Sequence, residues 1–147
     1  KTFEVRVNHG FPQTMRECST TQRPKQESSW IEDDMIHDYS LLHQQGIAHS
    51  IEAFLDGERV GGLYGLAMGK VFFGESMFHK VSDASKVCFA CLIDLAQQHG
   101  IRMIDCQVHT PHLASLGARE ISRTEYLAGL KTLLDPLPSV VDWKAIS

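Results

Sequence analysis

Apolar side chains alternate with polar ones at the start of the chain, as they do in a strand with one buried face. Residues 2–8 follow this period of two and predict a strand. Residues 49–55 and 59–68 are apolar runs that flank Asp56 and Gly57, a dipeptide typical of a two-residue hairpin turn. We therefore expect these two runs to be neighbouring antiparallel strands.

A helical pattern lies between two further apolar runs. Residues 70–78 predict the third strand of a meander, and residues 102–108 predict a later strand. Between them a helix starts at a cap formed by Ser82 or Asp83 and ends near Gly100. Its apolar stripe consists of Cys88, Cys91, Leu92 and Leu95. Because a helix joins these two strands, we expect them to be parallel, with a right-handed crossover.

Two pairs of residues have the spacing of a helix capping box. Ser29 and Glu32 precede one helix, and Ser122 and Glu125 precede the last one. The expected apolar face of the first of these helices consists of Ile31, Met35, Tyr39 and Leu42. Before it, residues 19–29 have almost nothing to bury and predict a mobile polar loop.

The elements follow in the order strand, helix, three-strand meander, helix, strand and helix. This order predicts a mixed α/β (α+β) fold with a mostly antiparallel sheet, one parallel step around the crossover helix, and helices on both faces. It resembles the layout of GNAT acyltransferases, in which the strands that flank the crossover helix splay apart. We expect a single GNAT-like catalytic domain over residues 1–147, with a substrate cleft in that splay.

Composition narrows the class of protein without naming a function. The chain has 147 residues, 43% of them hydrophobic and 22% charged, which is typical of one globular domain. The net charge of −4 and the scattered basic residues argue against a broad nucleic-acid-binding face. Because no apolar run approaches the ~20 residues of a membrane helix and no signal peptide opens the chain, we expect no membrane partner and a cytoplasmic location, with its four cysteines reduced.

A carboxylate and an amide lie two residues apart on an otherwise apolar strand. Side chains alternate along a strand, so Asp105 and Gln107 are expected to face the same way. A charge on a core strand is costly unless it is paired or has a function. Glu75 lies late on the other splayed strand, so the three polar side chains are expected to meet in one cleft. A structural Asp–Gln pair is the alternative explanation.

Three other motifs are weaker candidates for chemistry. Cys88 and Cys91 have metal-ligand spacing, but they lie on the apolar stripe and no second pair completes a zinc site. His109 and His112 flank Pro111, which is expected to start a helix, and no carboxylate follows at ligand spacing. We therefore expect no metal. Three glycines in one strand are compatible with a close backbone or ligand contact, namely Gly61, Gly62 and Gly65.

The start of the crossover helix bears on the choice of cofactor. CoA-dependent GNAT enzymes usually carry a glycine-rich loop here, whose amides hold the pyrophosphate. This chain has HKVSDASK, with no glycine and with Asp83, which would repel a pyrophosphate. We therefore expect no CoA and no other cofactor, and keep a CoA-dependent N-acetyltransferase as an alternative.

Six segments together resemble the bacterial leucyl/phenylalanyl-tRNA–protein transferases: SWI, GIAHSIEAF, GGLYG, GESMFHKVSDASK, IDCQVHTPHLASLGARE and ISRTEYL. They cover residues 30–130 with little gap. The resemblance implies a GNAT-like aminoacyltransferase that moves Leu or Phe, and Met less well, from aminoacyl-tRNA to proteins with an N-terminal Arg or Lys, which marks them for degradation under the N-end rule.

The same resemblance assigns roles residue by residue. Asp105 and Gln107 match the family's catalytic pair, and Glu75 matches its cleft glutamate. Trp30 matches an aromatic residue that contacts the 3′ adenosine of the tRNA. The pocket for the transferred side chain is matched by Leu63, Phe72, Met77 and Leu92. His49 lies in a family motif without an assigned role.

Two departures from the family lead to further expectations. Leu92 stands where a phenylalanine is common, which would reshape the pocket. The chain begins at Lys1, past the family's N-terminal subdomain that holds tRNA, so we expect that subdomain to be absent. An inactive binding module left over from such an enzyme is a further alternative.

Overall fold

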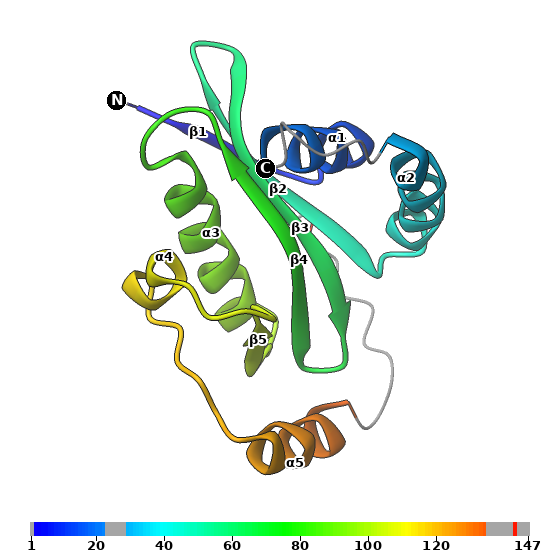
Figure 1. Ribbon diagram of the computed structural model, residues 1–147, viewed down its shortest axis with the longest axis vertical. Helices are drawn as coiled ribbons and strands as arrows, with labels where there is room; N and C mark the ends of the chain where they lie inside the picture. The colour runs from blue at the N-terminus through cyan, green and yellow to red at the C-terminus, as the bar shows by residue number, and fades with distance from the viewer. Residues whose placement is uncertain (1, 23–28, 135–142, 144–147) are drawn as a thin grey trace.

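The computed structural model describes residues 2–22, 29–134 and 143, with the backbone alone for residues 21, 22 and 29–32. Figure 1 shows the arrangement of the elements. In chain order they are β1 (Glu4–Val7), α1 (Phe11–Gln22), α2 (Ser29–Gln44), β2 (Ala48–Leu55), β3 (Glu58–Met68), β4 (Val71–His79), α3 (Ala84–Gln98), β5 (Met103–Asp105), α4 (Pro111–Ser115) and α5 (Arg123–Leu133).

The five strands form one sheet in the order β1-β2-β3-β4-β5. The first four are antiparallel to their neighbours, and β4 pairs with β5 in parallel, with α3 as the crossover. Asp56 and Gly57 form the β2–β3 turn with φ of 51° and 84°, values that suit the two-residue hairpin turn expected from this dipeptide. The mixed α/β fold with a parallel step is therefore confirmed.

Helices cover both faces of the sheet (Figure 1). On one face, α3 packs its buried side chains against β2, β3 and β4 in the larger core cluster, which includes Ile51, Phe72, Leu92 and Leu95. On the other face, α1 and α2 contribute Phe11, Met15, Cys18 and Ile36 to a second cluster that includes Tyr64 and Phe78 of the sheet. The sheet therefore lies between two apolar layers and is largely buried.

A β-bulge in β4 changes which face its side chains reach. Tyr64 pairs with Ser76 and Gly65 pairs with Gly74, so Glu75 is the extra residue without a partner on β3. Phe72 lies in the α3-side cluster, whereas Phe78 lies in the cluster on the other face. An even spacing would keep both on one face, so the bulge accounts for the switch.

The polar loop expected over residues 19–29 is wrong in its first part, because residues 19–22 are the last turn of α1. Residues 23–28 lie outside the described chain. The sequence contains the signal for this helix, since Phe11, Met15 and Cys18 repeat at helical spacing and all three are buried. Pro12 is also well suited to the first turn of a helix.

The expected face of α2 is also corrected. Met35 is 36% exposed, whereas its neighbour Ile36 is 6% exposed and packs against the sheet. Tyr39 and Leu42 are partly buried in the same cluster, as expected. The side chains of Ile31 and of the Ser29–Glu32 capping box lie outside the described residues.

The ends of α3 and α5 show two kinds of helix start. Ser122 accepts a hydrogen bond from the Glu125 N–H at 3.1 Å, which confirms the expected cap of α5. Asp83 precedes α3 at a left-handed φ of 71°, but its carboxylate makes no capping hydrogen bond. Cys88, Leu92 and Leu95 of the predicted stripe are buried, and Cys91 is half-buried. No helix among the described residues is long and apolar enough to cross a membrane.

Candidate functional site

The parallel pairing of β4 with β5 is short, and the two strands then separate. Three residue pairs form the ladder, the last of them Phe73 with Asp105. Beyond it β4 continues to His79, whereas β5 ends at Asp105. The backbone groups of β4 that follow Phe73 therefore lie at an open edge, next to the residues that follow β5 in the chain. The expected splay is present.

Asp105 and Gln107 are joined directly at this point, although not as two side chains on one strand face. The Gln107 N–H donates to Asp105 Oδ1 at 2.8 Å, an arrangement in which an aspartate closes a turn onto the second residue after it. Gln107 has a left-handed φ of 66°, so the chain has left the strand there. The alternation expected over 102–108 is wrong after Asp105, because this turn replaces the strand.

The Gln107 side chain spans the gap between the separating strands. Its Nε2 donates to the carbonyl oxygen of Gly74 at 2.8 Å. Among the described residues, no donor forms a hydrogen bond with the Gln107 Oε1. A left-handed non-glycine residue costs ~1–2 kcal/mol, and here the two hydrogen bonds hold it in place. Gln107 therefore presents a fixed acceptor oxygen at the cleft.

Tyr126 of α5 is a site residue that the sequence did not reveal. Its hydroxyl donates to Asp105 Oδ2 at 2.6 Å. The hydrogen bond to Asp105 raises the pKa of Tyr126, with smaller contributions from burial and from the aspartate charge. Both oxygens of Asp105 thus accept a hydrogen bond. The capping box that positions Tyr126 was visible in the sequence, but its contact with a residue 21 positions earlier was not.

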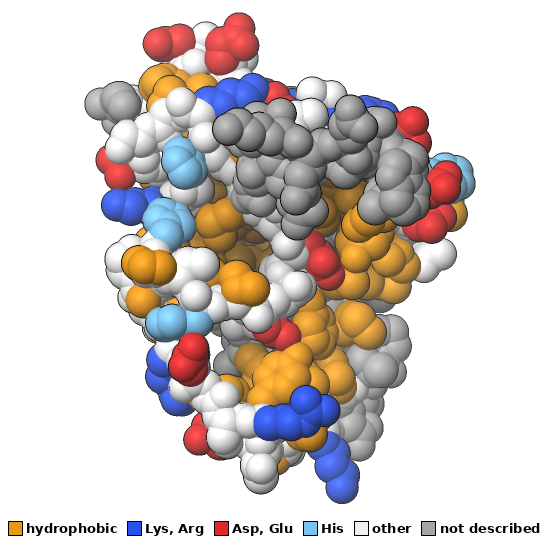
Figure 2. Space-filling view, in the orientation of Figure 1, with side chains coloured by type: hydrophobic (Ala, Val, Ile, Leu, Met, Phe, Trp, Pro, Cys, Tyr) orange, Lys and Arg blue, Asp and Glu red, His pale blue; other side chains and the backbone are white. Residues whose placement is uncertain are grey.

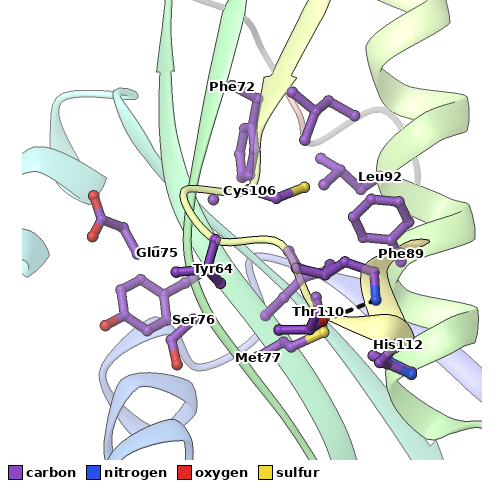
Figure 3. Close-up of a pocket in the computed structure, with 15 residues that line it drawn as sticks. Tyr64, Phe72, Glu75, Ser76, Met77, Phe89, Leu92, Cys106, Thr110 and His112 are labelled. Atoms are coloured by element: carbon purple, nitrogen blue, oxygen red, sulfur yellow. Dashed lines mark hydrogen bonds between the residues drawn. The ribbon is translucent and has the colours of Figure 1, made fainter. Parts of the chain in front are cut away.

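Glu75 lies at the border of the same region but does not contact Asp105 or Gln107 in any described hydrogen bond. It hydrogen-bonds Tyr39 of α2, and burial, followed by the nearby Glu75 charge, raises the pKa of Tyr39. Figure 3 shows the Glu75 carboxylate pointing away from Phe72 and Leu92. The three-way meeting expected from the sequence is therefore realised only for Asp105 and Gln107, because the bulge turns Glu75 toward α2.

An apolar cavity of about 320 Å³ lies between β4, α3 and the segment after β5. All four residues that the resemblance assigned to the pocket line it: Leu63, Phe72, Met77 and Leu92. The cavity is also lined by Phe89, Glu75 and Cys106. Figure 3 shows Phe72, Leu92 and Met77 around the opening, and Figure 2 shows a recess with apolar side chains on this face of the molecule. The dimensions suit one large apolar side chain.

Asp105 and Gln107 belong to a second, wider cleft of about 1050 Å³ that adjoins the apolar cavity. Its lining includes Cys106, Val108 and Ile104, which also line the cavity. The other walls come from the α4–α5 segment and include Arg119, Arg123 and Tyr126. A ligand with an apolar end and a polar body can therefore occupy both spaces and pass beside Asp105.

His49 is not at the cavity. It is 3% exposed on β2 and stacks on Trp143 with ring centres 4.5 Å apart. Its Nε2 donates to the carbonyl of Gly46 at 2.9 Å, so Nδ1 is the acceptor for Asn8 Nδ2 at 3.1 Å. These contacts give His49 a structural position that ties β2 to the chain around it.

Trp30 lies in the first turn of α2, but its side chain lies outside the described residues. Since α2 also carries Tyr39, which contacts Glu75, the helix borders the same region.

Two weaker candidates from the sequence are a pyrophosphate site at the start of α3 and a metal site. The N-terminus of α3 has no glycine, and Asp83 lies there next to Lys86 at 3.4 Å, so a carboxylate stands at the end where a pyrophosphate would bind. Among the described residues no group of three or more His, Cys, Asp or Glu side chains could hold a metal ion. Cys88 packs in the core, and Thr110 caps α4, which starts at Pro111 as expected.

Solved structures that the chain resembles include acetyltransferases. The chain matches the aminoglycoside N-acetyltransferase AAC(6')-Iy with a TM-score of 0.62 at 17% identity, over 84% of this chain and 95% of that one. It matches a predicted acetyltransferase from Clostridium acetobutylicum with a TM-score of 0.63 at 8% identity, over 83% of this chain and 93% of that one. At these identities the likeness establishes the GNAT fold alone.

Sequence relatives are much closer. A protein from Cupriavidus necator named leucyl/phenylalanyl-tRNA–protein transferase is 50% identical over 142 residues, which cover 97% of this chain and 56% of that protein. Its namesake from Paraburkholderia phytofirmans is 48% identical, with 97% and 57% covered. The chain thus spans little more than half the length of these relatives. The family model for leucyl/phenylalanyl-tRNA protein transferase matches residues 1–131. This chain therefore belongs to the leucyl/phenylalanyl-tRNA–protein transferase family.

Proposed function

We propose that this chain is the acyl-transfer half of an aminoacyltransferase that moves leucine or phenylalanine, and methionine less well, from aminoacyl-tRNA to the N-terminal Arg or Lys of an acceptor protein. The observation that carries the proposal is the joined Asp105–Gln107 pair beside an apolar cavity of about 320 Å³. This arrangement holds an apolar aminoacyl side chain next to polar groups that can orient an amine.

The donor's side chain occupies the cavity, in contact with Phe72, Met77 and Leu92. These walls have no charge, so they select by size and shape, and an apolar pocket discriminates only loosely between similar side chains. That fits a donor set of Leu, Phe and Met. The ester carbonyl then lies near the opening, close to Gln107, and Trp30 is the residue we assign to the 3′ adenosine of the tRNA.

The reaction needs an amine in the right place more than a strong base. The acceptor's α-amine has a pKa of about 8, so a sizeable fraction is neutral at physiological pH. Gln107 Oε1 accepts a hydrogen bond from this amine and directs its lone pair at the ester carbonyl. The C–N bond forms, the C–O bond to the ribose 3′ oxygen breaks, and the amine proton ends on that oxygen. Asp105 holds Gln107 by its backbone and offers negative charge near the developing ammonium.

Glu75 is the residue we assign to the cationic side chain of the acceptor. None of the ion pairs among the described residues involves Glu75, so its carboxylate is available for an Arg or Lys side chain. Tyr39 holds it at the border of the cavity. Because the four cysteines are free thiols, we place the reaction in the reducing cytoplasm, where it would mark acceptor proteins for degradation.

The decisive assay is transfer of labelled leucine from leucyl-tRNA to a peptide that begins with Arg. A peptide with the same sequence and an acetylated N-terminus is the matched control, because it has no nucleophilic amine. Transfer of label to the peptide with a free N-terminus, and none to the acetylated peptide, supports the proposal. A longer natural form, which shares this domain, should be assayed beside this chain. Failure of both forms would contradict the proposal.

Acetyl-CoA distinguishes the alternative from the proposal. If the chain acetylates the same Arg peptide and ignores leucyl-tRNA, it is a CoA-dependent N-acetyltransferase instead. The Asp83 carboxylate at the start of α3 argues against this outcome. If neither donor is used while an aminoacyl-adenosine still binds, the chain is an inactive binding module.

A further inference from the structure

The carboxylate of Asp105 is held from two separate parts of the chain. Oδ1 accepts from the Gln107 N–H at 2.8 Å, and Oδ2 accepts from the Tyr126 hydroxyl at 2.6 Å. The terminal torsion of an aspartate side chain is otherwise broad, so one hydrogen bond would leave the carboxylate free to turn. Together the two hydrogen bonds define its plane.

Tyr126 reaches Asp105 because of the way α5 starts. The Ser122 side chain caps the helix, and the Tyr126 N–H donates to the Ser122 carbonyl at 2.9 Å. This fixes Tyr126 in the first turn. Further along, the Leu133 carbonyl accepts from the Lys70 N–H at 2.8 Å, and Gly129 lies against Met103, where a Cβ would come within 2.8 Å of the Met103 side chain.

These contacts attach α5 to the sheet lightly, since no side chain of α5 is fully buried. The phenol of Tyr126 is the one described α5 side chain with a hydrogen bond to β5. A tyrosine phenol is protonated at physiological pH and can donate, and the hydrogen bond to Asp105 raises its pKa further.

We propose, on the basis of the proposed transferase function, that Tyr126 is a positioning residue that acts through Asp105. By holding Oδ2, it keeps Oδ1 aimed at the Gln107 N–H and so maintains the left-handed turn that points the Gln107 amide into the cleft. Tyr126 does not touch the reacting atoms. Helix α5 therefore contributes to the transfer site and not only to the fold.

The test is Tyr126→Phe, which removes one hydroxyl and keeps the ring. We expect kcat for leucine transfer to fall about 10-fold to 100-fold, because the Gln107 amide is no longer held in line, while KM for tRNA and peptide changes less than about twofold. Leu127→Ala, on the exposed side of the same helix, is the matched control and should leave kcat unchanged. Unchanged kcat in Tyr126→Phe would overturn the proposal.

A double-mutant cycle separates positioning from mere stability. If Tyr126 acts through Asp105, then Tyr126→Phe added to Asp105→Ala, which leaves no carboxylate for the phenol to hold, causes no further loss of kcat. A structural role would instead give two independent, multiplicative losses, and that result would overturn the proposal. Thermal unfolding of each variant shows whether the domain remains folded.

A measurement without turnover keeps this inference distinct from the proposed function. In ¹⁵N-labelled protein, Tyr126→Phe should shift the backbone and side-chain amide signals of Gln107, whereas Leu127→Ala should not. If the wild type transfers no leucine, the proposed function fails, and these signals still report whether Tyr126 positions Gln107. Unmoved Gln107 signals would overturn the positioning whatever the activity.

Discussion

The amide of Gln107 and the carbonyl of Gly74 are joined by a 2.8 Å hydrogen bond at the place where the parallel ladder has just ended. A side chain thus takes the position that the next backbone hydrogen bond of the ladder would have had. The strands separate beyond it without leaving the Gly74 carbonyl unpaired. The opening of the sheet and the placement of Gln107 are therefore one structural feature.

Asp105→Asn should reduce leucine transfer by ~10²-fold or more. The domain should remain folded, because the Asn oxygen can still accept from the Gln107 N–H, and the Tyr126 hydroxyl can turn to accept from the Asn amide. Steady-state rates measure the effect. Asp94→Asn, on the exposed side of α3, is the control. Near wild-type turnover in Asp105→Asn would show that the carboxylate charge is not needed.

Leu92→Trp should shift the donor preference toward leucine. Leu92 is 1% exposed and lines the cavity, so a larger ring there reduces the space for a phenylalanyl group more than for a leucyl group. The ratio of leucine to phenylalanine transfer should rise about tenfold in a competition assay with both charged tRNAs.

Two further variants test whether the change in ratio comes from the cavity or from a general loss of packing. Met77→Phe fills the cavity from β4 instead of α3 and should change the ratio in the same direction. Leu41→Phe, at a position 45% exposed on α2, should leave it unchanged. If both cavity variants keep the wild-type ratio, Leu92 and Met77 are core residues only.

Cys106 should report occupancy of the cavity. It lines the cavity and is half-buried, and burial, together with the nearby charge of Asp105, raises the pKa of its thiol. Alkylation should therefore be slow and should accelerate as the pH rises. A non-hydrolysable phenylalanyl-adenosine amide should slow it several-fold further.

The control for this labelling is Cys91, which is half-buried on α3 and does not line the cavity. Its rate, measured by peptide mapping in the same sample, should not respond to the analogue. Cys18 and Cys88 should stay unmodified in the folded protein, because both are fully buried. Equal protection of Cys91 and Cys106 would mean that the analogue binds elsewhere.

Gly65→Ala should destabilise the domain by ~1–3 kcal/mol or more. A Cβ at Gly65 would collide with the Phe73 carbonyl oxygen and lie 2.6 Å from the ring of Phe72, and the backbone contact cannot be relieved by a rotamer change. Urea unfolding measures the loss. Gly129→Ala is the control, since its Cβ would meet only the flexible end of Met103. Equal stability of the two variants would contradict this packing.

Glu52 should make stability depend on pH. It is fully buried on β2, accepts from Thr14 at 2.9 Å and from the His9 N–H at 3.1 Å, and burial raises its pKa above 4.5 despite these bonds and the charge of Arg59. The folded protein therefore holds this proton more tightly than the unfolded chain. The stability that this adds is complete below pH 4.5 and is lost as pH rises through the raised pKa.

The matching measurement is urea unfolding of wild type and Glu52→Gln between pH 4.5 and pH 7.5. Since Gln does not titrate, raising the pH should destabilise the wild type more than the variant. The free energy of unfolding of Glu52→Gln should therefore rise relative to that of the wild type. A difference between the two proteins that stays constant over this range would show that Glu52 titrates normally.

The local patterns of the chain determined most of its secondary structure. The Asp56–Gly57 turn, the Ser122 cap and the period of α3 were readable because each depends on residues within a few positions of one another. The parallel step also followed from the sequence, since a helix between two strands leaves few other connections. Helix α1 was not predicted, although its buried residues Phe11, Met15 and Cys18 repeat at helical spacing.

The site was determined in part by contacts that no local pattern contains. Strand alternation suggested that Asp105 and Gln107 act together, but the strand ends at Asp105, and the turn, the bulge at Glu75 and the hydroxyl of Tyr126 decide where these groups point. Each depends on segments distant in sequence. The sequence of a short strand does not by itself fix where the strand ends. The end is set by where pairing with the neighbouring strand stops, which is a property of the tertiary structure.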